Sequence, residues 1–239
     1  MHKSTLAILG FVICFSCTVR PPLTMDAARA SLISTLSSDT IRSLKGNGTA
    51  VFAQNGEQFS ASFDISWNGD SAFSAQFYGP LGMTFASIRS VTAVRWLVSA
   101  GDSQYVQHPS QRVRVGQGFL EYPFTWEELL AALTLRYPCR TDLGTPPDSM
   151  FTDRKTTRLL WKARRFHGQP ADISVSLDNK SHRLSEITYS AREGSGEKVI
   201  FGGFLDGRPK EIRIITFDSN YFYVKYHALT VNPRKAFSP

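Results

Sequence analysis

Few residues in this chain stand in an arrangement that could support catalysis or metal binding. The histidines beyond His2 lie far apart, and none has a partner at the spacing of a metal site: His108, His167, His182 and His227. No serine lies in a Gly-x-Ser-x-Gly sequence. Glu127 and Glu128 are adjacent carboxylates, but they follow Thr125, and helix capping explains acidic residues there. We therefore expect no enzyme activity, no metal and no cofactor.

Cys17 is the residue best placed for a covalent modification. It ends a segment that starts with a short basic stretch, His2-Lys3, and continues as an uncharged, mostly apolar run over residues 6–15. Such a run is typical of a secretory signal, because a membrane span needs about 20 apolar residues. Ser16 followed by Cys17 resembles the end of a bacterial lipobox, in which the cysteine thiol receives a diacylglycerol before cleavage.

Two interpretations of this segment stay open. In the first, residues 1–16 are a signal peptide, Cys17 is a lipid anchor, and residues 17–24 are the lipidated N-terminus and a stiff tether. In the second, an ordinary signal peptide happens to contain two cysteines, since Cys14 stands where a lipobox usually has Leu. We favour the first, which attaches the protein to a membrane.

The composition favours a single exported domain. The chain has 239 residues, 42% of them hydrophobic, which is enough for a core over residues 25–232 with a tail at 233–239. After processing at Cys17, only Cys139 would remain besides the anchor, so no disulfide framework is possible. The net charge of +7 is dispersed without a nucleic-acid-binding signature, and we expect no nucleic-acid partner. Anionic lipid headgroups, an acidic partner or solvent alone would suit this charge.

Period-two patterns dominate the chain after Leu44. One set of apolar residues alternates with Ser and Asp, as in a half-buried strand: Phe59, Ala61, Phe63, Ile65 and Trp67. Asn68-Gly69-Asp70 predicts a tight turn, after which Phe73, Ala75 and Phe77 resume the alternation. Helices are expected over residues 25–37 and after Thr125, which forms a capping box with Glu128. Residues 137–153 are predicted to be a surface loop.

These patterns predict a mainly β fold. About eleven antiparallel strands in meander order, each with one apolar face, must curl around an interior that their apolar faces enclose. We therefore expect an open, unclosed β-barrel of about eleven strands, with two or more α-helices plugging its concave side. A lipophilic interior follows from the many aromatic residues, and a closed core without a cavity is the alternative.

The turn Gly79-Pro80-Leu81-Gly82 is the most distinctive internal element. It lacks the Lys-Ser/Thr pair of a phosphate loop, and it places Leu81 at the tip between two strands. Leu81 either folds back onto the core or is an exposed apolar residue that contacts lipid.

Several of these segments resemble LolB, the outer-membrane lipoprotein receptor. Residues 59–67 and 73–82 are similar to its central part, and residues 182–190 and 198–204 are similar to its C-terminal half in order and spacing. The strand ending at residues 228–232 resembles related LolB-like lipoproteins. The likeness extends from about residue 27 to residue 232.

The resemblance implies a membrane-tethered acceptor of acyl chains. LolB-like proteins take lipoproteins from a soluble periplasmic carrier and insert them into the outer membrane, and a protruding Leu, here Leu81, assists insertion. The partners would be acylated lipoproteins and that carrier, and the protein would be a monomer on the outer membrane, facing the periplasm. We choose the residues that line the acyl-chain cavity by alternation: Phe63, Trp67, Phe73, Phe77, Phe85 and Trp96. Ordinary core packing is the alternative for each.

Two other functions remain open at this point. The protein could be a tethered carrier for a different lipid or apolar molecule, or an envelope scaffold with a filled barrel and no ligand. Bound phospholipid or glycolipid would indicate the carrier, and a structure without a cavity would indicate the scaffold.

Mass spectrometry of the mature N-terminus tests the anchor. We expect the chain to begin at Cys17 and to carry a diacylglycerol on the cysteine sulfur. An unmodified Cys17, or a mature chain that begins after it, would mean that the segment is an ordinary signal peptide.

Overall fold

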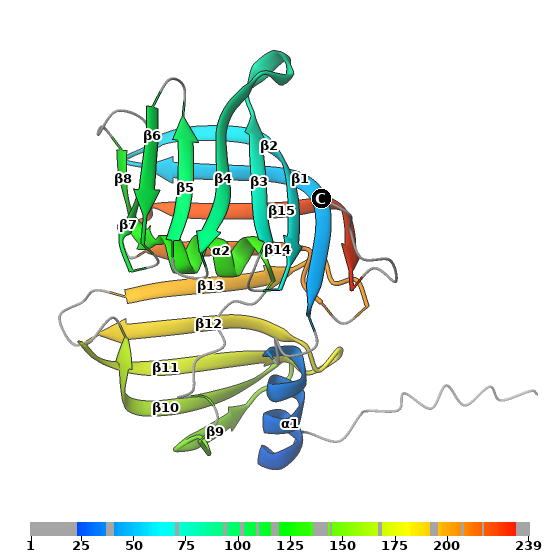
Figure 1. Cartoon of the computed structure of the whole chain (residues 1–239). Coiled ribbons are helices and arrows are strands. Elements are labelled where there is room, and N and C mark those ends of the chain that lie inside the picture. The colour runs from blue at the N-terminus through cyan, green and yellow to red at the C-terminus, as the bar shows by residue number, and fades with distance from the viewer. Residues whose placement is uncertain are drawn as a thin grey trace, which may run out of the picture.

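The computed structural model in Figure 1 describes most of the predicted domain. The described residues are 23–36, 41–69, 72–92, 95–100, 103–108, 110–115, 120–135, 143, 145–166, 169–191, 196–206, 208–216 and 218–232. The predictions for residues 1–16, for Cys17, for most of the tether and for the tail at 233–239 fall outside these ranges and stay predictions.

One antiparallel sheet of 13 strands contains most of the described chain. Its order is β6-β5-β4-β3-β2-β1-β15-β14-β13-β12-β11-β10-β9. The strands are β1 Ser43–Gln54, β2 Glu57–Asn68, β3 Ala72–Tyr78, β4 Thr84–Thr92, β5 Arg95–Ala100, β6 Ser103–Gln107, β9 Ser149–Thr152, β10 Thr156–Phe166, β11 Gln169–Asp178, β12 Leu184–Ala191, β13 Gly196–Gly202, β14 Glu211–Thr216 and β15 Tyr221–Val231. Within the described residues, β6 and β9 form edges that do not pair with each other, so the barrel is open, as the sequence predicts.

Two helices and a short hairpin complete the fold. The hairpin of β7 (Arg112–Val115) and β8 (Leu120–Thr125) leads directly into α2 (Trp126–Leu133), and Figure 1 shows α2 lying across the sheet. α1 (Met25–Leu36) lies beside β10–β12, where Ala28 and Leu32 are fully buried. Among the described residues, no helix is long and apolar enough to cross a membrane.

The sequence-predicted capping box is present at the start of α2. The Thr125 hydroxyl accepts a hydrogen bond from the Glu128 N–H at 3.3 Å, and Glu128 Oε2 accepts one from the Thr125 N–H at 2.8 Å. These two bonds satisfy donors that the first turn of a helix otherwise leaves unpaired. The carboxylate of Glu128 is thus a structural cap, which is the interpretation that the sequence favours.

β1 and β15, the first and last strands along the chain, pair along nearly their whole length in the middle of the sheet. β1 pairs with β2 on one side and with β15 on the other, and its register to β15 shifts at a bulge between Asn47 and Gly48. A Cβ atom on Gly48 would lie 2.2 Å from the Lys225 carbonyl oxygen, and one on Gly46 would lie 2.7 Å from that of Ala228. Glycine is therefore required here so that the two backbones can approach each other.

The alternation along β2 gives the sheet its apolar face. Phe63, Ile65 and Trp67 are buried, while Ser62 and Asp64 between them are exposed. The half-buried strand and the partner strand β3 predicted from the sequence are therefore both confirmed.

Three short strands were not predicted. β6 and β8 lack a long apolar alternation, and β9 lies inside the segment 137–153, so the prediction of a loop is wrong for Ser149–Thr152. These four residues form a strand because β10 offers them a long partner, with Phe151 opposite Arg158. Such pairing depends on the neighbouring strand and leaves little trace in a four-residue sequence.

Replacing Gly48 with Ala should strongly destabilise the protein. The new methyl group would overlap the Lys225 carbonyl, so we expect the free energy of unfolding to fall by at least about 2 kcal/mol. Urea denaturation of the full chain measures this change.

Gly202→Ala is the matched control, because a Cβ there would lie 3.7 Å from its nearest neighbour, the Glu211 carboxylate. Its unfolding free energy should change by no more than about 0.5 kcal/mol. Equal effects of the two substitutions would contradict the close approach of β1 and β15.

Candidate functional site

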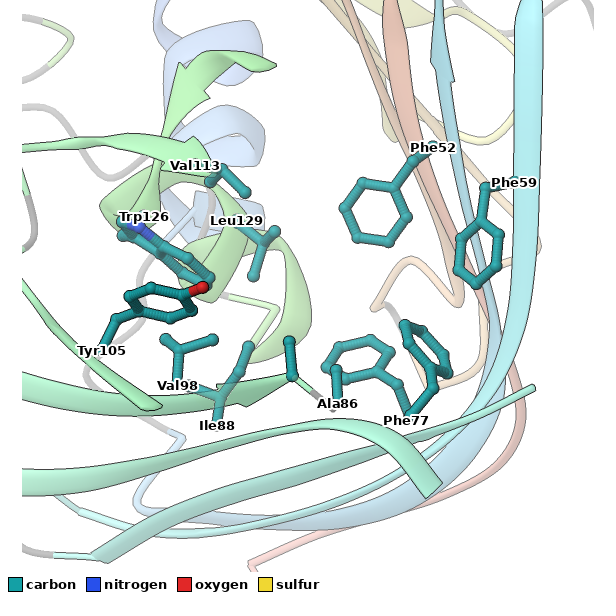
Figure 2. A pocket seen from close by; sticks show the side chains of 12 residues that line it. Phe52, Phe59, Phe77, Ala86, Ile88, Val98, Tyr105, Val113, Trp126 and Leu129 are labelled. Carbon is teal, nitrogen blue, oxygen red and sulfur yellow. The ribbon is translucent and has the colours of Figure 1, made fainter. Parts of the chain in front are cut away.

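An apolar pocket lies between the inner face of the sheet and α2 (Figure 2). Strands β1–β6 supply one part of its lining, and β7 and α2 supply the rest. The lining residues are Phe52, Phe59, Phe77, Phe85, Ala86, Ile88, Val98, Ala100, Tyr105, Val113, Trp126 and Leu129. The side-chain atoms that face the pocket are therefore almost all carbon.

The free space in this pocket is small. The cavity measures about 40 Å³, and since one water molecule needs about 10–15 Å³ of such a cavity, it has room for only a few water molecules. In the close-up, Phe52, Phe59 and Phe77 form one wall, and Trp126, Leu129 and Tyr105 stand opposite (Figure 2). A bulky ligand must therefore push these two walls apart.

Aromatic contacts hold the wall formed by the sheet. The rings of Phe52 and Phe222 lie 4.7 Å apart between centroids, and Phe222 also packs against Phe124 at 6.0 Å. Phe59 meets Phe85 edge to face at 4.9 Å, and Phe85 lies 6.3 Å from Phe77. Such pairs add stabilisation beyond the area that they bury.

α2 is fixed to the rest of the protein at both of its ends. The backbone N–H of Trp126 donates a hydrogen bond to the backbone carbonyl of Gln111 at 3.0 Å, which ties the first turn of the helix to the residue just before β7. At the other end, the hydroxyl of Tyr226 on β15 donates a hydrogen bond to the Leu133 carbonyl. Burial raises the pKa of Tyr226 well above its usual range, so this phenol stays protonated and remains a donor.

Two of the six predicted cavity residues line the pocket, namely Phe77 and Phe85. Phe63, Trp67 and Phe73 are on the same inner face but are buried in the core, and Trp96 is half-buried against that core. Trp67 and Phe73 are cross-strand partners at the far end of the β2–β3 hairpin from Tyr78 and Ser62. Alternation thus identifies the face of a strand but does not say where along the strand a cavity lies.

Several lining residues have a signal in the sequence that points only to burial. Trp126 and Leu129 lie on one face of the predicted helix, which marks them as core residues. Phe52 and Phe59 flank the Asn55-Gly56 turn, and Ile88 and Val98 are cross-strand partners. Tyr105 and Val113 come from short strands, and only the tertiary structure brings them to the pocket.

The loop between β3 and β4 extends beyond the sheet (Figure 1). Leu81 at its tip is 95% exposed and Met83 is 67% exposed, so the alternative in which Leu81 folds back onto the core is wrong. Leu81 has a left-handed backbone with φ 67°, a conformation that costs a non-glycine residue about 1–2 kcal/mol. Hydrogen bonds from the Gly79 N–H to the Met83 carbonyl (2.9 Å) and from the Gly82 N–H to the Gly79 carbonyl (3.2 Å) hold this turn.

Acidic, histidine and cysteine side chains do not gather in the described part of the chain. No group of three or more of them there is placed to hold a metal ion. The described site can therefore be understood as an apolar pocket with a projecting apolar loop.

Comparisons with known proteins identify the fold. No protein-family model matches the sequence, and no curated protein does. Its structure is similar to a LolA superfamily protein from Nitrosomonas europaea, with a TM-score of 0.56 and 10% identity over 88% of this chain and 94% of that one.

Two further structures are similar but more distant. One is a domain from Vibrio parahaemolyticus described as an outer-membrane lipoprotein-sorting protein, with a TM-score of 0.48 and 13% identity over 89% of this chain and 93% of that one. The other is a DUF1329 family protein from Desulfovibrio piger, with a TM-score of 0.47 and 11% identity over 89% and 95%. The first likeness establishes a LolA-like fold, and at this low identity it does not distinguish LolB from its structural relatives.

Replacing Tyr226 with Phe should loosen α2. The buried Leu133 carbonyl would lose its donor, so the free energy of unfolding at neutral pH should fall by about 1–2 kcal/mol. Urea denaturation at a series of pH values measures both this loss and its pH dependence.

The alkaline range gives the sharper comparison. The pKa of Tyr226 is higher in the folded than in the unfolded protein, so its contribution to stability is complete below about pH 10 and is lost as the pH rises further. Tyr226→Phe should therefore lose less stability than the unaltered protein between neutral pH and strongly alkaline pH. Parallel pH curves for the two proteins would mean that Tyr226 is not held protonated.

Proposed function

We propose that this protein is a lipid-anchored acceptor that takes lipoproteins by their acyl chains and inserts them into the outer membrane. The observation that carries the proposal is the combination of a carbon-lined pocket with a fully exposed Leu81 on a loop beside it. The LolA-like fold and the sequence resemblance to LolB support it.

The pocket offers the interactions that an acyl chain needs. Each methylene group that leaves water for an apolar site contributes about 0.8 kcal/mol, so a lipoprotein with several chains gains strongly from such a pocket. Transfer requires only that the chains move from carrier to pocket to membrane in order of increasing stability. No catalytic group takes part in this process.

The small volume of the pocket suits an acceptor whose walls separate only when an acyl chain binds. Because the free space is only about 40 Å³, the inner face of the sheet is shielded from water, which avoids the cost of a hydrated apolar cleft. An incoming chain would replace contacts between side chains with contacts to itself. Binding therefore has to widen the space between α2 and the sheet.

The projecting loop provides the contact with the membrane. Leu81 and Met83 lose little packing when they enter lipid, because both are largely exposed to solvent. Their transfer into the bilayer is favourable, and it would bring the end of the sheet from which the loop projects to the membrane surface.

Depletion of the protein, followed by complementation, tests this function. Lipoproteins should accumulate on the soluble periplasmic carrier when the protein is depleted, and the unaltered gene should reverse this. Leu81→Glu should still bind lipoproteins but restore insertion at least about tenfold less well, because a carboxylate enters hydrocarbon at a cost well above 1.4 kcal/mol.

Val106→Glu is the matched control, since Val106 is also an exposed apolar residue, at 61%, but lies on the edge strand β6. It should complement fully. Normal lipoprotein sorting after depletion would rule out the proposed function, and co-purified phospholipid or glycolipid in place of lipoprotein would indicate a carrier for another lipid. Full activity of Leu81→Glu would contradict only the role of the loop.

A further inference from the structure

The residues that line the pocket differ in their exposure, and the difference locates the mouth of the pocket. Trp126 and Leu129 are at most 2% exposed, and Phe52 and Phe77 are nearly as buried. Phe59 is 38% exposed, although it lines the same space. Phe85 and Ala86, at the start of β4, are half-buried, as are Ala100 and Tyr105, so Phe59 is the one exposed residue of the described lining. The pocket therefore opens on the side where β2 begins and β4 begins.

Strand pairing explains why Phe59 and Phe85 meet at this opening. The pairing of β2 with β3 runs from Ser62–Tyr78 to Asn68–Ala72, so Phe59 lies beyond its end. Phe85 is the second residue of β4 and lies at a bulge, between the pairs Tyr78–Thr84 and Phe77–Ala86 at the end of β3. Phe59 therefore has no partner on β3, and its ring meets that of Phe85 on the next strand edge to face at 4.9 Å. Their contact covers the end of β3.

The same opening lies at the base of the projecting loop. A Cβ atom on Gly79 would lie 3.8 Å from the ring of Phe85, which places the first residue of the loop against this side chain. Met83 lies two residues before Phe85, and Leu81 two residues before Met83. The exposed apolar residues Leu81 and Met83 thus precede Phe85 on the same short segment, and the ring of Phe85 contacts those of Phe59 and Phe77.

We propose that Phe59 and Phe85 form a gate through which acyl chains enter and leave the pocket. This inference rests on the proposed function, because it concerns the path of the same acyl chains. Phe59 is the moving side chain, since its exposed ring can swing into solvent without disturbing the core, whereas the ring of Phe77 behind it is only 3% exposed. When the gate is closed, its edge-to-face contact shields the pocket from water and slows the exchange of ligand.

A gate changes the rates of binding and release together, and this distinguishes it from an ordinary binding contact. Phe59→Ala should accelerate both association and dissociation by about 2- to 10-fold, the factor that corresponds to one aromatic pair, with a much smaller change in the dissociation constant. Phe85→Ala should act in the same direction. Val98→Ala is the matched control, because Val98 on β5 lines the pocket on the side away from Phe59 and should change dissociation alone.

The measurement uses the full chain reconstituted in lipid nanodiscs and a long-chain fatty acid that carries a fluorescent acceptor for tryptophan emission. Stopped-flow mixing gives the association rate, and an excess of unlabelled fatty acid gives the dissociation rate, with empty nanodiscs as the blank. Equal acceleration of both rates in Phe59→Ala is the expected result.

The possible failures are distinguishable. If the unaltered protein gives no energy transfer above the blank, the acyl-chain pocket itself is refuted, and the gate with it. If binding occurs but Phe59→Ala and Phe85→Ala leave both rates unchanged, or alter dissociation alone as Val98→Ala does, the gate is refuted and the proposed function stands.

Discussion

The close approach of β1 and β15 is the constraint on which the rest of the structure depends. It joins the first and last strands of the chain in the middle of the sheet, so that two meanders, β2–β6 and β14–β9, extend from it in opposite directions. Gly46 and Gly48 permit this approach because a side chain at either position would meet a β15 carbonyl. The bulge beside Gly48 increases the local twist, as bulges do, and helps the two halves of the sheet to curl toward each other. Without this junction there would be no concave face for α2 to cover.

The pocket is a consequence of covering a large concave face with a short helix. α2 is only 8 residues long, yet it presents Trp126, Leu129 and Leu133 to the interior. Tyr226 of β15 anchors the end of this helix. The strand that pairs with β1 in the middle of the sheet therefore also positions α2 over the pocket.

Local features of the structure were predictable from the sequence, and those that depend on tertiary pairing were not. The alternation around Phe63 and the capping box at Thr125 and Glu128 depend on neighbours within a few residues, and both are present. Phe77 and Phe85 could be chosen as pocket residues by their face, but Trp67 could not be excluded, because its distance from the pocket depends on the register of β2 with β3. β9 escaped prediction because its partner β10, and not its own sequence, makes it a strand. Tyr226 gives no local sign that it will reach Leu133, a residue 93 positions away.

The pocket lining is shielded from water, whereas Leu81 is exposed to it, and this difference bears on the function of the protein. The pocket is closed by contact between Phe59 and Phe85, which keeps its lining out of water. Leu81 is instead held in water by a left-handed turn, at a conformational cost that packing does not repay. A carrier that diffuses freely through an aqueous compartment would gain nothing from such a residue, because it invites nonspecific apolar contacts. A protein tethered to a membrane meets lipid at high local concentration, and there an exposed leucine beside the mouth of the pocket brings the site of release to the surface that receives the cargo. This asymmetry favours an acceptor at the membrane over a soluble carrier with the same fold.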